Sequence, residues 1–186
     1  MNAMISQDEL HVLSYYRACE LAGAVLFGKL ALHTDHDEYR VPLTRHALEE
    51  AQHAWEWTAT ITALGCRPVK VTRTYQSEYG KRLGLPRDII EVFCLTQVFE
   101  KRSVAHYRRH LELAGVHPLV RKALKKLIDD EAYHLDWIRK ELDQYAGNGR
   151  AAEVDDTMRR FQLMDEAVYS DIIQTSPFAE YFGGRP

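Results

Sequence analysis

Apolar residues recur every three or four positions along most of the chain, which is the spacing of one face of an α-helix. Leu13, Tyr16, Ala24 and Phe27 follow this spacing. Most glycines and all prolines fall between the periodic stretches or at their first residue, and no alternation long enough for a β-sheet competes with the pattern. Helices are therefore predicted over residues 7–33, 42–64, 87–114, 118–146 and 151–175.

Residues that begin and end helices stand at the boundaries of these stretches. Ser6 and Glu9 have the spacing of a capping box, and Pro42 suits the first turn of the second helix. Asn148-Gly149 marks a turn before the last predicted helix. The tail from Ser176 onward is predicted to be irregular.

The connections between the first four predicted helices are short, long and short. Residues 34–41 and 115–118 are short joints, so the helices that they join are expected to be antiparallel neighbours. Residues 65–85 form a connection of about 20 residues, which can span the length of a bundle. This order is typical of a four-helix bundle with one crossover. We therefore expect an all-α protein of one domain over 1–186, with a bundle core over 7–146 and an additional helix over 151–175.

Two Glu-x-x-His motifs stand in the second and fourth predicted helices, at Glu50–His53 and Glu131–His134. Residues i and i+3 share a face of a helix, so each motif can direct a carboxylate and an imidazole at one point. Both motifs lie near the middle of their helices. The midpoints of the first and third predicted helices fall on Glu20 and Glu100, in faces that are otherwise apolar. The four carboxylates are therefore predicted to lie at one height of the bundle.

Four carboxylates that meet inside a bundle would repel one another, and burying an unpaired ion costs on the order of several kcal/mol. Two divalent metal ions balance four negative charges, and two neutral imidazoles complete the ligand set. Mixed carboxylate and imidazole ligands suit iron or manganese. The sequence therefore predicts a dinuclear metal site in the interior.

This pattern, with one Glu from each of two helices and Glu-x-x-His from each of the other two, resembles the ferritin-like di-iron carboxylate superfamily. The resemblance covers residues 7–146 and implies a ferritin-like four-helix bundle. It implies two iron ions (Fe2+/Fe3+), with manganese as an alternative in one or both positions. By this likeness Glu50 and Glu131 bridge the metals, and Glu20 and Glu100 are terminal ligands. The implied ligand set is Glu20, Glu50, His53, Glu100, Glu131 and His134.

An acidic residue precedes each of the two motifs. A metal-bound histidine normally donates its second ring N–H to an outer acceptor. In related bundles a carboxylate just before one Glu serves the His of the opposite helix, which implies that Asp130 holds His53 and that Glu49 holds His134. The alternative, that both are solvated surface acids, stays open. His46, one turn before Glu50 on the same face, is interpreted as a histidine at the edge of the core.

The composition narrows the class of protein. The net charge of −3, with Lys+Arg 24 against Asp+Glu 27, gives no global attraction to nucleic acid or to anionic membranes. No apolar run approaches the roughly 20 residues of a transmembrane helix. Gln7, Asp8 and Glu9 stand where a signal peptide would be apolar, which indicates a cytoplasmic protein. Three cysteines without a C-x-x-C motif argue against a disulfide scaffold, a zinc ribbon and a rubredoxin-type iron site.

The resemblance implies O2 or peroxide chemistry but leaves several reactions open. We favour a non-haem di-iron oxidoreductase that oxidises or hydroxylates a small organic substrate and takes electrons from an external donor, although Val104 stands where hydroxylases often carry a threonine. The runner-up is a ferroxidase and iron-storage protein of bacterioferritin type, whose haem-ligating Met is replaced here by Ala51. A rubrerythrin-like peroxidase ranks third, because Gln97 stands one turn before Glu100 where an extra carboxylate is expected. A structural bundle with a vestigial metal site, and a homodimer, also stay open.

Overall fold

The computed structural model describes residues 5–183, and every regular element in that range is helical. The chain divides into two compact units. The first unit runs through Glu78 and includes His117–Ala123, and the second unit comprises Tyr79–Val116 and the chain from Leu124 onward. The α-helices are α1 Gln7–His33, α2 Asp37–Ala63, α3 Tyr75–Leu83, α4 Ile89–Glu112, α5 Pro118–Tyr145, α6 Ala151–Ile173 and α7 Phe178–Phe182.

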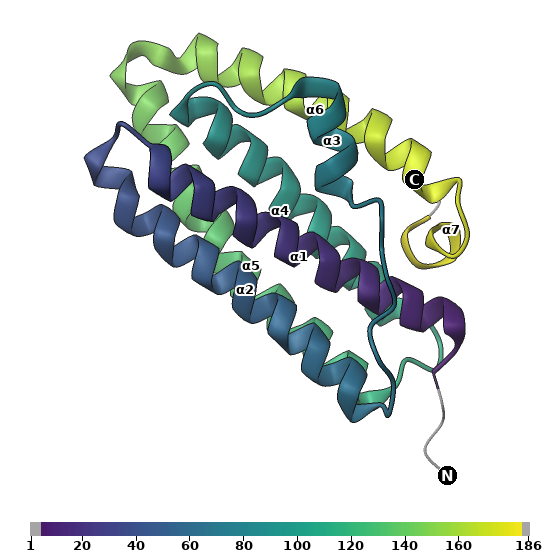
Figure 1. Cartoon of the computed structure of the whole chain (residues 1–186). Helices are drawn as coiled ribbons and strands as arrows, with labels where there is room; N and C mark the ends of the chain where they lie inside the picture. The colour runs from purple at the N-terminus through teal and green to yellow at the C-terminus, as the bar shows by residue number, and fades with distance from the viewer. Residues whose placement is uncertain (1–4, 184–186) are drawn as a thin grey trace. The chain divides into compact units, whose positions relative to one another are not determined.

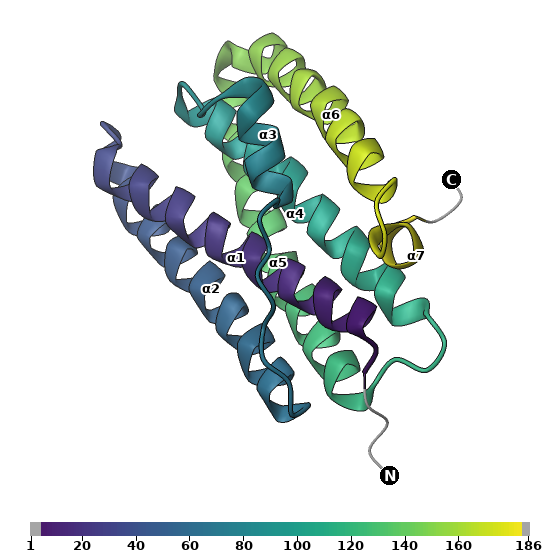
Figure 2. The ribbon, with the colours of Figure 1, turned by 45° about the vertical axis from the view of Figure 1, so that its right-hand side comes forward.

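The first unit is built on the hairpin of α1 and α2, which run side by side in opposite directions (Figures 1 and 2). The hydroxyl of Ser6 accepts a hydrogen bond of 3.0 Å from the backbone N–H of Glu9, so the predicted cap is confirmed. Apolar side chains also pack between the two helices, and the rings of Tyr16 and Trp57 lie 5.0 Å apart. The connection after α2 is tied back to α1, because the N–H of Val69 donates to Oγ of Ser14.

The second unit contains α4, α6, α7 and most of α5, and α6 runs along α4 (Figure 2). Phe93 of α4 packs edge-on against Trp137 of α5, with ring centroids 5.6 Å apart. Arg102 of α4 forms an ion pair with Asp165 of α6. His106 of α4 stacks on Phe182 at 4.0 Å. Charged and aromatic contacts therefore fasten the C-terminal helices to α4.

One carboxylate in this unit is held by two guanidinium groups. Arg87 and Arg160 both donate to Oε1 of Glu91, at 2.5 Å each. Burial by itself would raise the pKa of Glu91, but the hydrogen bonds from the two arginines outweigh it and hold the pKa at about 2. Glu91 is therefore a charged anchor between α4 and α6.

Several predicted boundaries differ from the structure. The second helix begins at Asp37, not at residue 42, and Pro42 lies inside it. A proline this close to a helix start removes only one backbone hydrogen bond, and Asp37 and Glu38 in the first turn favour the helix N-terminus electrostatically. Residues 65–85 contain α3, so the predicted long connection is partly helical. The tail from Ser176, predicted to be irregular, contains α7.

The break between the last two long helices lies where the sequence predicts it. Asn148 and Gly149 leave the helical conformation, and Gly149 has a φ of +88°, which a glycine adopts without strain. Among residues 5–183, no helix combines the length and the apolar character needed to cross a membrane.

Candidate metal centre

In the first unit, three candidate ligands lie together between α1 and α2. Glu20 comes from the middle of α1, and Glu50 and His53 come from α2; all three side chains are buried. One donor atom from each lies within 4.8 Å of the other two. Nδ1 of His53 is 3.8 Å from Oε2 of Glu20. The structure therefore brings together the three predicted ligands of this helix pair.

The carboxylate of Glu50 lies against the backbone of α1 at Gly23. A Cβ atom built on Gly23 would come within 2.3 Å of Oε2 of Glu50, which is far inside van der Waals contact. Only glycine leaves room for the carboxylate at this position. Gly23 was not among the residues predicted for the site, although a glycine in the middle of a long helix, one turn after Glu20, is a signal of close approach.

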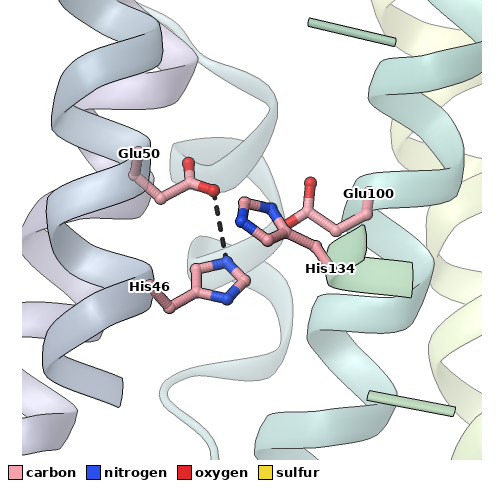
Figure 3. A group of neighbouring side chains, drawn as sticks. All are labelled: His46, Glu50, Glu100 and His134. Atoms are coloured by element: carbon pink, nitrogen blue, oxygen red, sulfur yellow. Dashed lines mark ion pairs between the residues drawn. The ribbon is translucent and has the colours of Figure 1, made fainter. Parts of the chain in front are cut away.

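His46 is a further member of this cluster on α2. Its side chain is buried, and its Nε2 lies 3.2 Å from Oε1 of Glu50, as the dashed line in Figure 3 marks. Its ring packs on Phe27 of α1 with 3.9 Å between centroids. The spacing of four residues places His46 on the face of Glu50. His46 was predicted to lie on that face but not to be one of the ligands.

In the second unit, the other three candidate ligands form a matching group. Glu100 comes from α4, and Glu131 and His134 come from α5; all three are buried. Nδ1 of His134 lies 2.8 Å from Oε2 of Glu131, and a carboxylate oxygen of Glu100 lies within 4.8 Å of a ring nitrogen of His134. Figure 3 shows the side chains of Glu100 and His134. Each unit thus buries two glutamates and one motif histidine.

These donor sets suit a divalent cation. In the first unit the oxygens of Glu20 and Glu50 approach within 4.8 Å, where two charged carboxylates repel by about 3 kcal/mol at an effective dielectric constant of about 20. A divalent ion cancels two carboxylate charges, and a neutral imidazole adds a nitrogen donor. Oxygen and imidazole nitrogen donors without thiolates favour iron or manganese over soft metals. The residues of each unit therefore fit a metal of this class.

The two acidic residues expected behind the histidines have other partners on their own helices. Arg45 donates to Glu49 at 2.9 Å, and Lys126 donates to Asp130 at 2.9 Å. Both are pairs with i,i+4 spacing on the helix surface. The hydrogen bonds from His134 to Glu49 and from His53 to Asp130 stay predictions.

Comparisons of the chain with protein-family models, with curated proteins and with solved structures gave no match. The interpretation of the centre consequently depends on its residues and on the geometry of each unit. The composition of the two groups is the same, two glutamates and one histidine from a pair of helices. Buried donors of this kind can hold a redox-active metal away from bulk water.

Proposed function

We propose that the two groups together bind a pair of iron ions, and that the chain is a ferritin-like di-iron oxidoreductase. In this proposal α1, α2, α4 and α5 form the bundle, and each helix supplies one carboxylate. The observation that carries it is the burial of two glutamates and one Glu-x-x-His histidine in each unit. Four buried carboxylates need about four compensating positive charges, which two divalent ions provide.

The proposed roles follow the position of each residue. All six residues would hold the ions: Glu50 and Glu131 would be shared by both, Glu20 and Glu100 would each serve one, and His53 and His134 would supply nitrogen donors. Manganese is an alternative in one or both positions. Gly23 contributes by leaving space for the carboxylate of Glu50 beside α1.

The protein's contribution to the chemistry is positioning and exclusion of water. A bound iron pair supplies the two electrons with which O2 is reduced or peroxide is cleaved. The side chains of Glu20, Glu50, His53 and Glu131 are buried, so bulk water does not compete with these donors for a bound metal. The proposed substrate is a small organic molecule, and an external donor supplies the electrons for the next turnover.

The experiment that tests this function starts with protein loaded with Fe2+ without oxygen. Exposure to O2 should consume O2 and develop ferric absorption in proportion to the bound iron. Repeated turnover should occur only when a reductant and an oxidisable substrate are present. Glu20→Gln, which keeps the shape of the side chain and removes one charge, should lower the iron content and the O2 uptake together.

Different outcomes assign different functions. Accumulation of many ferric ions per chain would indicate iron storage, and reaction with hydrogen peroxide but not with O2 would indicate a peroxidase. Protein that folds and behaves identically with and without metal would contradict the proposal, because a structural bundle with a vestigial site predicts that result.

A further inference from the structure

His46 contacts the candidate centre although it belongs to neither Glu-x-x-His motif. Its side chain is 2% exposed, and Nε2 lies 3.2 Å from Oε1 of Glu50 (Figure 3). With His53 it gives α2 the pattern His-x3-Glu-x2-His, in which all three residues share one helix face. Because its imidazole is buried and faces a candidate ligand, His46 has a different role from the edge histidine that the sequence predicts.

The distance between the two side chains fits binding to a common ion. Two ligand atoms that bind one metal at right angles, each about 2.1 Å away, lie about 3.0 Å apart. The observed 3.2 Å between Nε2 of His46 and Oε1 of Glu50 is close to this value. An ion that binds this oxygen of Glu50 can therefore be reached by His46 without a shift of the backbone.

The surroundings of His46 hold its ring in place. The ring packs against Phe27 at 3.9 Å between centroids, with 39° between the planes. Because this contact comes from α1 and the carboxylate from α2, the imidazole is fixed from two sides. Such fixed orientation is what a metal ligand requires, since affinity falls when the donor must be ordered on binding.

We infer that His46 is a seventh protein ligand of the metal centre and binds the same ion as the Oε1 atom of Glu50. This inference rests on the proposed function. It makes the two ions unequal, because one carries two imidazoles and the other carries one. The ion with fewer protein ligands would then keep more open coordination positions.

Cobalt-loaded protein tests this inference without any turnover. Each imidazole bound to Co2+ keeps one N–H, which gives one strongly shifted, exchangeable proton resonance. The wild-type protein should show three such resonances, and His46→Gln should show two, with cobalt bound about 10-fold more weakly or worse. A matched control is His106→Gln, because His106 is also buried and also stacks on a phenylalanine, and this variant should keep three.

The count in the wild-type protein decides the question even if His46→Gln folds poorly. Two resonances in wild-type protein that binds cobalt would overturn this inference but not the proposed function, and would mean that His46 only pairs with Glu50. An absence of cobalt binding by the wild-type protein would instead overturn the proposed function, and this inference with it.

Discussion

Replacing Gly23 by alanine tests the close approach of Glu50 to α1. The added Cβ would lie 2.3 Å from Oε2 and 3.0 Å from Cδ of Glu50. To restore ordinary contact the carboxylate must move by about 1 Å, whereas metal–ligand distances tolerate only about 0.2 Å. Gly23→Ala should therefore weaken metal binding by about 10-fold or more, the size of effect seen when the support of a ligand is removed.

Gly28→Ala is the matched control for this change. Gly28 lies in the same helix, and a Cβ built on it meets nothing within 4 Å. Alanine is favoured over glycine in a helix interior by about 1 kcal/mol, which corresponds to a rise of about 2–4 °C in the melting temperature of a chain of this size. Gly28→Ala should show this gain and bind metal like the wild-type protein.

The two variants are compared by metal titration and by thermal unfolding of the metal-free proteins. Gly23→Ala should gain less stability than Gly28→Ala, because the same helix preference is offset by displacement of a buried carboxylate. Equal metal affinity of Gly23→Ala, Gly28→Ala and wild type would refute the reasoning, since Glu50 could then not lie against α1 when it binds the metal.

Three further outcomes are expected. The pKa of Glu91 is held at about 2, below its ordinary value of 4.5, so its charge stabilises the fold above about pH 4.5 and this effect is lost as the pH falls toward 2. Glu91→Gln should therefore lower the free energy of unfolding by about 1.5–3 kcal/mol at pH 7 and by almost nothing near pH 2. Denaturant unfolding at the two pH values measures both. Burial raises the pKa values of Cys19 and Cys94 to about 12, so both thiols should resist thiol reagents at pH 8. The native protein should then be labelled only at Cys66, and the unfolded protein at all three cysteines. Fast labelling of a second thiol in the native protein would contradict this. Leu127→Ala should destabilise the metal-free protein by about 2–5 kcal/mol, and Glu131→Ala should destabilise it by less. Both side chains are buried, but Glu131→Ala also removes a charge from the interior. A larger loss of stability in Glu131→Ala would show that the other carboxylates do not repel this one.

The long helices were predictable because each carries its own signals. The Ser6 cap and the apolar spacing of α1 set its bounds at Gln7–His33, as predicted, and Pro118 begins α5 as expected. A local signal also marks the start of α3. Thr74 and Ser77 cap its first turn, each accepting a hydrogen bond from the other's backbone N–H. However, α3 has only nine residues, most of them polar, so its apolar spacing is too short to distinguish a helix from a loop.

The candidate ligands were predictable for a different reason. A Glu-x-x-His spacing fixes the relative position of two side chains on one helix, as Glu131 and His134 show at 2.8 Å. Contacts that depend on how two helices pack are not encoded in such spacing. The approach of Glu50 to Gly23 and the packing of His46 on Phe27 are of this kind, and only the paired α1 and α2 reveal them.

The metal content of the wild-type protein and of Glu131→Ala tests the central claim most directly. Protein loaded anaerobically with Fe2+ and freed of excess metal should hold two ions per chain, and Glu131→Ala should lose most of both, because the two groups of ligands share one centre. Loss of only one ion in Glu131→Ala would show two separate sites, one in each unit. Unchanged metal content in the variant, or no bound metal in the wild-type protein, would contradict the account.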